Sequence, residues 1–197
     1  MREETAEVLA DLVRRRPDIQ PCEEAIRSAY ELVLASQRRG GRLLVCGNGG
    51  SAADSLHIVG ELLKSFYLPR RLPEALRRRL EATHPTLGPY LALNLQSPIR
   101  AVSLVSEAAL MTAVINDTAA DVVFAQQVLG QGCEGDVLQK MNAPRSLTWQ
   151  HHSGNLAFVQ WRRSGLKSRG TNPWRALEIL KNDKKSYKNW LGCSKVR

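Results

Sequence analysis

The sequence lacks any run of about 18 apolar residues, so no transmembrane helix is expected. The N-terminal stretch has no apolar segment of the kind found in secretory signal peptides, and instead has the spacing of an amphipathic helix. The four cysteines are scattered and form no CxxC pair, which gives no sign of a disulfide framework or a cysteine metal site. These absences favour a reduced, cytoplasmic protein.

Lysine is almost absent from residues 1–138. This part of the chain contains one lysine, Lys64, together with 14 arginines and 17 acidic residues. Residues 139–197 hold the other 13 basic residues, only two acidic residues and all four tryptophans. The net charge of +9 therefore comes entirely from this end of the chain. We expect one domain over residues 1–138 and a basic, tryptophan-containing tail over residues 139–197. The abrupt change suggests the hypothesis that the tail is foreign, through a reading-frame change, a fusion or a misassembled gene end.

A basic tail with interleaved tryptophans could contact phosphates and stack bases. The sequence contains no helix-turn-helix, zinc-knuckle or RNP pattern, however. A solvated basic end explains the charge more simply, so nucleic acid is not expected as a partner.

Apolar spacing over residues 1–138 predicts alternating helices and strands. The run at residues 42–46 is short, continuous and apolar, which is typical of a strand buried on both faces. This order predicts an α/β fold, a three-layer α/β/α sandwich of the flavodoxin-like type with a parallel sheet, altered or truncated after its third strand. The predicted helices cover residues 3–15, 22–39, 52–66, 107–115 and 121–129, and the predicted strands cover 42–46, 99–105 and 135–138.

Residues 67–99 are interrupted by five prolines, and only residues 74–82 have helical spacing. We interpret the segment as a long excursion between the first two strands. Its arginines could form an anion-binding lid, although a solvated helix face is the simpler interpretation. These arginines are Arg70, Arg71, Arg77, Arg78 and Arg79.

The motif that carries chemistry is Gly47-Asn48-Gly49-Gly50-Ser51, between a strand and a helix. Glycines let the backbone approach an anion closely, and the free amides of a helix start point at it with the positive end of the helix dipole. The Ser51 hydroxyl can add a donor. The motif is neither GxxxxGK[ST] nor GxGxxG, so neither a nucleoside triphosphate nor NAD is indicated. A plain strand–helix connection would also fit such a turn.

His57 and Glu61 are four residues apart on the predicted helix and therefore share a face. Such a pair can share a divalent metal, and Glu61 can act as a base. A surface pair on a solvated face is the alternative. Asn116 and Asp117 end another apolar helix, where an asparagine commonly acts only as a cap.

Three segments together resemble the sugar isomerase (SIS) domain, specifically its phosphoheptose isomerase group. They are LLVCGNGGSAADSLHIVGELL, AVSLVSEAALMTAVINDTAADVVFAQQV and EGDVL. The resemblance covers about residues 3–138. It implies that His57 is a zinc ligand and that Glu61 is both a ligand and the catalytic base. It further implies substrate contacts for Asn48, Gly49, Gly50, Ser51, Asn116 and Asp117.

The reaction implied by the resemblance converts sedoheptulose 7-phosphate to D-glycero-D-manno-heptose 7-phosphate through an enediol. A carboxylate moves a proton between adjacent carbons while a zinc ion stabilises the enediolate oxygen. The resemblance also implies a homotetramer with sites at subunit interfaces.

The tail departs from the family. The serine-rich loop that grips the phosphate has only a chance-level echo at Ser153–Asn155, and the family's fourth and fifth strands are missing from the sequence pattern. Residues 155–161 could form either a strand or a helix. The family's later glutamine and histidine have no counterpart, although His151 or His152 could replace a ligand. A second function therefore stays open: a non-catalytic SIS-type module that senses a phosphosugar or docks on a protein such as the bacterial replication initiator. The His57–Glu61 pair favours catalysis, and the missing ligands favour the module.

Overall fold

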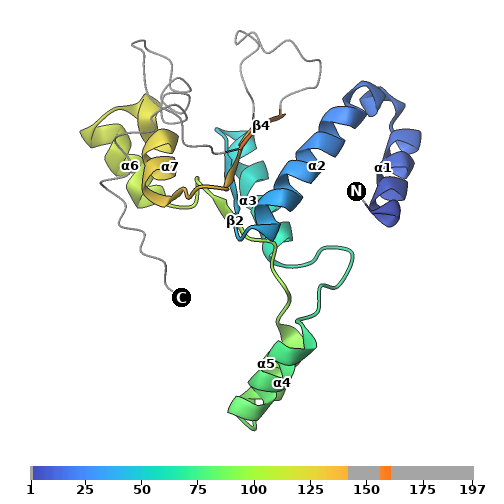
Figure 1. Cartoon of the computed structure of the whole chain (residues 1–197). Helices are drawn as coiled ribbons and strands as arrows, with labels where there is room; N and C mark the ends of the chain where they lie inside the picture. Colours follow the sequence, from blue (N-terminus) through green and yellow to red (C-terminus); the bar gives the residue numbers. More distant parts are fainter. Residues whose placement is uncertain (1, 142–155, 161–197) are drawn as a thin grey trace.

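The computed structural model describes residues 2–141 and the strand at residues 156–160, and the fold is given for these ranges (Figure 1). Two short 3₁₀ helices, η1 (Pro17–Cys22) and η2 (Ala120–Val122), lead into longer helices. The α-helices are α1 (Glu3–Arg15), α2 (Glu23–Arg38), α3 (Gly50–Leu63), α4 (Glu74–Thr83), α5 (Leu87–Asn94), α6 (Ala108–Asp117) and α7 (Val123–Gln131). The strands are β1 (Leu43–Cys46), β2 (Ala101–Ser103), β3 (Val137–Met141) and β4 (Leu156–Gln160).

The strands form one sheet in the order β2-β1-β3-β4. The three strands predicted from the sequence are parallel, with Leu43 of β1 level with Ala101 of β2 and Val137 of β3. The fourth strand, β4, lies in a segment for which the sequence left strand and helix open, and it pairs with β3 in the antiparallel direction. The rest of residues 142–197 lies outside the described residues, so the hypotheses on the tail stay predictions.

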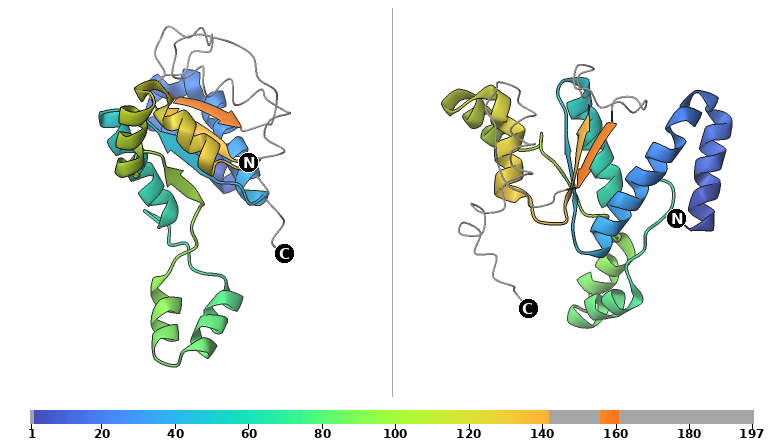
Figure 2. Two further views of the ribbon diagram at one scale, coloured as in Figure 1. Left: turned by 90° about the vertical axis from the view of Figure 1, so that its left-hand side faces the viewer. Right: turned by 45° about the horizontal axis from the view of Figure 1, so that its top comes forward.

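Strand β1 is buried on both faces, as its continuous apolar run predicted. Leu43 and Val45 pack with Val59 of α3 and with α2, while Leu44 and Cys46 pack with α6 and α7. Figure 2 shows the resulting layers, with α2 and α3 on one side of the sheet and α6 and α7 on the other. The predicted three-layer α/β/α architecture is confirmed.

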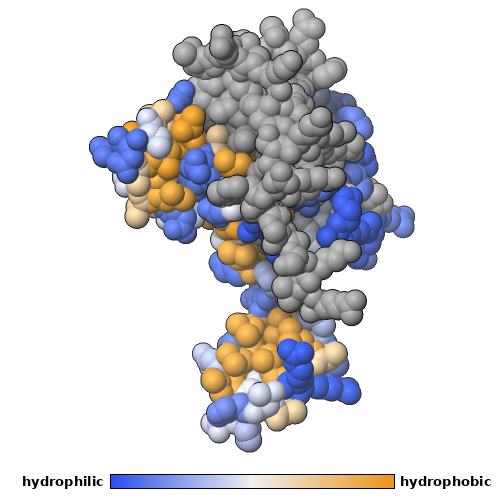
Figure 3. Space-filling model, turned by 60° about the vertical axis from the view of Figure 1, so that its left-hand side comes forward, coloured by the Kyte–Doolittle hydropathy of each residue, from blue (hydrophilic) through white to orange (hydrophobic). Residues whose placement is uncertain are grey.

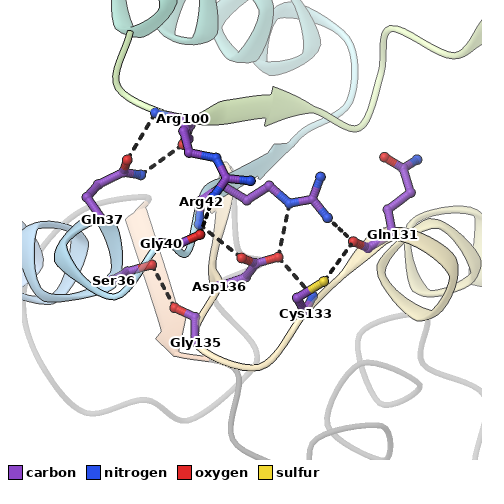
Figure 4. A network of polar contacts seen from close by, with 9 residues as sticks. All are labelled: Ser36, Gln37, Gly40, Arg42, Arg100, Gln131, Cys133, Gly135 and Asp136. Carbon is purple, nitrogen blue, oxygen red and sulfur yellow. Dashed lines mark hydrogen bonds and ion pairs between the residues drawn. The ribbon is translucent and has the colours of Figure 1, made fainter. Parts of the chain in front are cut away.

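The amino-terminal edge of the sheet is held by the buried carboxylate of Asp136 (Figure 4). This carboxylate accepts hydrogen bonds from the Arg42 amide (2.9 Å), the Arg42 Nε (3.2 Å) and the Cys133 amide (2.9 Å). Arg42 directly precedes β1 and Asp136 directly precedes β3. The Asp136 side chain therefore holds the first residues of these two strands next to each other.

Helix α2 is joined to the same edge of the sheet (Figure 4). The Gln37 side chain donates to the Arg100 carbonyl (2.9 Å) and accepts from the Arg100 amide (3.0 Å), just before β2. The Ser36 hydroxyl donates to the Gly135 carbonyl (2.6 Å). These contacts bind α2 to the loops that precede β2 and β3, so the edge opposite the Gly-rich turn is a closed polar network.

The excursion between β1 and β2 contains a helical hairpin, α4–α5, that projects away from the sheet (Figures 1 and 2). The predicted helix at residues 74–82 is confirmed as α4, but α5 was missed. Proline misled the sequence interpretation, since Pro89 lies in the first turn of α5, where proline is tolerated. At Gly88, a Cβ would lie 2.1 Å from the Leu80 carbonyl oxygen, so glycine lets the two helices approach closely.

Three of the five arginines of the excursion have partners within the chain rather than facing the Gly-rich turn. Arg70 caps the carboxyl end of α3, because its guanidinium donates to the carbonyls of Leu62 (2.8 Å) and Glu61 (3.2 Å). Arg77 and Arg78 pair with Glu74 on their own helix, at 3.1 and 2.8 Å. No helix within the described part of the chain combines the length and the apolar character needed to cross a bilayer.

Candidate functional site

The Gly-rich turn lies at the carboxyl end of β1, where parallel α/β sheets commonly bind ligands. Gly49 precedes α3 with a φ of +57°, a conformation that L side chains rarely adopt. Gly47 is buried, and a Cβ there would lie 2.6 Å from the Ser51 carbonyl oxygen. Two glycines of the motif are therefore required by the backbone itself.

The rim of this turn is open to solvent. Asn48, Gly49 and Gly50 are exposed, and among the described residues the amides of Gly49 and Gly50 have no hydrogen-bond acceptor. These amides lie at the start of a 14-residue helix, whose dipole favours an anion at that end. Ser51 is buried beneath the rim, so a hydrogen bond from its hydroxyl to a ligand stays a prediction.

His57 and Glu61 share one face of α3, as their spacing predicted. The His57 Nε2 lies 4.0 Å from the Glu61 Oε1, with the His57 side chain 77% exposed and that of Glu61 25% exposed. The Lys64 ammonium also reaches Glu61 Oε1, at 3.1 Å. The sequence interpretation overlooked Lys64, although its position three residues after Glu61 places it on the same face.

The other carboxylate oxygen of Glu61, Oε2, is buried and has no hydrogen-bond partner among the described residues. A buried polar atom without a partner is costly, so such atoms often mark a functional position. This oxygen is therefore the one available to take a proton or bind a cation.

Within residues 2–141, no three side chains of histidine, cysteine, aspartate or glutamate converge as a metal site would require. His57 and Glu61 offer an imidazole and a carboxylate, which are both zinc ligands, but zinc sites in proteins use three or four protein donors. His151 and His152 lie outside the described residues. The described residues thus offer two side chains of the kind that bind zinc, fewer than a zinc site needs, and zinc stays a prediction.

Asn116 and Asp117 end α6, and the Asn116 side-chain amide donates to the Asp117 carboxylate at 2.8 Å. Helix α6 packs on one face of the sheet through Val114, whereas α3 packs on the other face through Val59. The structure therefore does not bring Asn116 and Asp117 together with the His57–Glu61 pair within one chain.

A lysine that the sequence interpretation assigned to the tail lies at the same edge as the turn. Lys140 of β3 is buried, and it is level with Cys46, the last residue of β1 before the turn. Burial raises the pKa of the Cys46 thiol to about 12, and the nearby Lys140 only partly offsets this effect. Cys46 is therefore an unreactive thiol, while Lys140 brings a positive charge to this edge.

A hollow of about 590 Å³ lies elsewhere, between α1 and Tyr67. Glu4, Glu7 and Asp11 line it together with Arg15, which pairs with Asp11, so its net charge is negative and disfavours an anionic ligand. It contains no residue of the Gly-rich turn.

Comparison with known proteins points to one family. The SIS domain family matches residues 9–88. The phosphoheptose isomerase of Rhodospirillum rubrum is 35% identical over 138 residues, covering 70% of this chain and 55% of that protein. The phosphoheptose isomerase of Geobacter sp. is 30% identical over 165 residues, covering 84% and 66%.

A solved structure, the phosphoheptose isomerase GmhA from Neisseria gonorrhoeae, aligns with a TM-score of 0.43 and 28% identity, covering 72% of this chain and 60% of that one. The chain spans about half the length of the first relatives that it matches.

Proposed function

Because the chain belongs to the SIS domain family and, within it, to the phosphoheptose isomerase group, we propose that it is a phosphosugar isomerase. The proposed substrate is sedoheptulose 7-phosphate and the product a heptose 7-phosphate. The observation that carries the proposal is the buried Oε2 of Glu61, which has no partner among the described residues and lies on the helix that begins at the open Gly-rich turn.

In the proposed reaction, Glu61 takes a proton from C1 of the ketose and returns it to C2. The hydroxyl proton on O1 is lost and O2 gains one, so the carbonyl moves from C2 to C1 through an enediol. The Glu61 Oε2 has no hydrogen-bond donor among the described residues and is therefore free to take the proton, while the Lys64 ammonium on Oε1 balances the charge of the carboxylate.

The phosphate would bind at the Gly47–Ser51 turn, where exposed amides supply donors. Lys140, at the same edge of the sheet, would supply a positive charge in place of the serine-rich loop of the family. Its ammonium is a point charge that suits a phosphate.

Glu61 lies 11 positions after Gly50 in α3, which is about 16 Å along a helix axis. An extended seven-carbon sugar phosphate is shorter than this backbone span, and it would meet Glu61 of the same copy only if the side chain of Glu61 reached back toward the turn. We therefore propose that a complete site combines the turn of one copy with His57 and Glu61 of a second copy, in a homo-oligomer. Asn116 and Asp117, on the other face of the sheet, would also act toward a second copy.

A zinc ion held by His57 and Glu61 remains part of the proposal, and it would supply stabilisation of the enediolate oxygen. The residues described supply only two of its ligands, so the proton transfer above does not depend on it.

The test is turnover of sedoheptulose 7-phosphate by the wild type and by Glu61→Gln. A neutral amide cannot accept the proton, so the rate should fall at least about a hundredfold. Glu81→Gln, on the exposed surface of α4, is the matched control and should leave the rate unchanged. Equal rates for Glu61→Gln and the wild type would remove Glu61 from the mechanism.

A second candidate is a non-catalytic phosphosugar-binding module. The incomplete metal site among the described residues favours it. Binding of sedoheptulose 7-phosphate without any turnover by the wild type would establish the module and rule out the isomerase.

A further inference from the structure

One oxygen of the Glu61 carboxylate lies beside two basic side chains. The Lys64 ammonium is 3.1 Å from Oε1, and the His57 Nε2 is 4.0 Å from the same oxygen. The other oxygen, Oε2, is buried and has no hydrogen-bond partner among the described residues. A metal ion shared by His57 and Glu61 would use Oε1, because this is the oxygen within 4.0 Å of the imidazole. Lys64 therefore contacts the atom that such a metal ion would need.

Lys64 reaches Oε1 because α3 ends at this residue. It is the C-cap residue of α3, three positions after Glu61, and its backbone is extended, with φ −122° and ψ 159°. A positive charge at the carboxyl end of a helix is favoured by the helix dipole. The last turn of α3 contains no basic residue, so the charge at this helix end comes from the C-cap lysine. Both the carboxylate and the helix end thus favour the ammonium where it lies.

The basic residues that follow α3 along the chain have other partners. The Arg70 guanidinium donates to the backbone carbonyls of Glu61, Leu62 and Ser97, at 3.2, 2.8 and 3.0 Å. On the projecting α4–α5 hairpin, apolar side chains gather on one face (Figure 3), and two arginines of α4 pair with a glutamate of the same helix. Lys64 is thus the basic side chain available to the Glu61 carboxylate.

We propose that the Lys64 ammonium and a divalent metal ion compete for Glu61, so that zinc binds at this site only when the ammonium moves away. The ammonium cancels the single negative charge that Glu61 would bring to the metal ion, and the two cations repel each other. Zinc sites use three or four protein donors, whereas the described residues offer two. A site with so few donors has little affinity to offset the competition.

The inference deepens the proposed function, because it names the cation that accompanies the proposed base. It rests on the same residues but not on turnover. Zinc affinity is measured without any sugar, so an absent competition and an inactive isomerase give different results. The side chain of Lys64 is 62% exposed, so its replacement should leave the fold intact.

The experiment is a zinc titration of the full chain with isotopically labelled histidine, followed by NMR. The ring signals of His57, identified by their loss in His57→Ala, report zinc at this site rather than elsewhere in the chain. Lys64→Met should bind zinc at His57 about three- to tenfold more tightly than the wild type, because an exposed ion pair and the repulsion of a cation are both removed. Lys64→Arg keeps the charge and should keep the wild-type affinity.

Two further variants separate local competition from a change in overall charge. Arg79→Met removes an equal charge from the exposed surface of α4 and should leave zinc binding at His57 unchanged. The gain in Lys64→Met should disappear when Glu61→Gln is added, because Lys64 acts through that carboxylate. Equal affinities in the wild type and Lys64→Met, no zinc binding at His57 in either protein, or a gain that persists with Glu61→Gln would each overturn the proposal.

Discussion

The amino edge and the carboxyl edge of the sheet, where the parallel strands begin and end, differ in whether their polar groups have hydrogen-bond partners. At the amino edge, the buried Asp136 carboxylate accepts three hydrogen bonds, and Gln37 and Ser36 satisfy backbone groups that precede β2 and β3. At the carboxyl edge, the turn leaves the amides of Gly49 and Gly50 without acceptors among the described residues. The first arrangement stabilises the fold, whereas the second leaves donors for a ligand.

The largest effect should come from breaking the amino edge. Asp136→Ala removes a carboxylate that serves the Arg42 guanidinium and two backbone amides, so it should lower the free energy of unfolding by about 3–5 kcal/mol. Denaturant unfolding followed by circular dichroism measures the change. Asp18→Ala, which removes an exposed pair with Arg16, should change stability far less. Similar losses for the two variants would contradict the role given to the Asp136 network.

Removing the positive charge of Lys140 at the carboxyl edge should have a smaller effect, and this effect should be on ligand affinity. Lys140→Met should weaken the binding of sedoheptulose 7-phosphate about tenfold or more, because a hydrogen bond to a charged group contributes about 1.5–3 kcal/mol. Calorimetric titration measures the affinity, and inorganic phosphate as a second ligand isolates the phosphate contribution. Arg79→Met removes an equal charge on the distant hairpin and serves as the control. An unchanged affinity in Lys140→Met would leave the turn amides as the only phosphate donors proposed here.

The smallest expected signal tests whether the two halves of the carboxyl-edge site come from different copies. Gly49→Val distorts the turn and Glu61→Gln removes the base, so each variant alone should be inactive. Co-expression should restore about a quarter of the wild-type rate, since random two-fold pairing gives one intact site in four. No recovery in mixed oligomers whose formation is verified would show that the turn and Glu61 do not act across an interface.

Sequence reasoning was most reliable where local chemistry determines structure. The burial of β1 and the shared face of His57 and Glu61 follow from apolar runs and helical spacing, which neighbouring residues alone can specify. It failed at α5, where Pro89 in the first turn resembled a helix breaker. It also gave no sign of the pairing of β4, because antiparallel pairing with β3 depends on residues far apart in the chain.

The candidate site was predictable in part for the same reason. The conformations of Gly47 and Gly49 follow from a tight strand–helix connection. Asn116 lies across the sheet from Glu61 because α6 and α3 cover opposite faces. The residues of each helix do not by themselves indicate which face the helix covers. The buried Oε2 of Glu61 likewise results from packing in three dimensions.

The ends of the excursion meet in space. The Ser97 amide donates to the Arg70 carbonyl at 2.7 Å, and the Ser97 hydroxyl donates to the Arg71 carbonyl at 2.9 Å. The backbones of Arg71 and Gln96 also form an isolated antiparallel β-bridge. A chain shortened by joining these neighbours would keep the Arg70 cap on α3 and the entry to β2. The α4–α5 arm is thus a detachable module, and the sandwich beneath it can be studied, redesigned or grafted with a different arm at this junction.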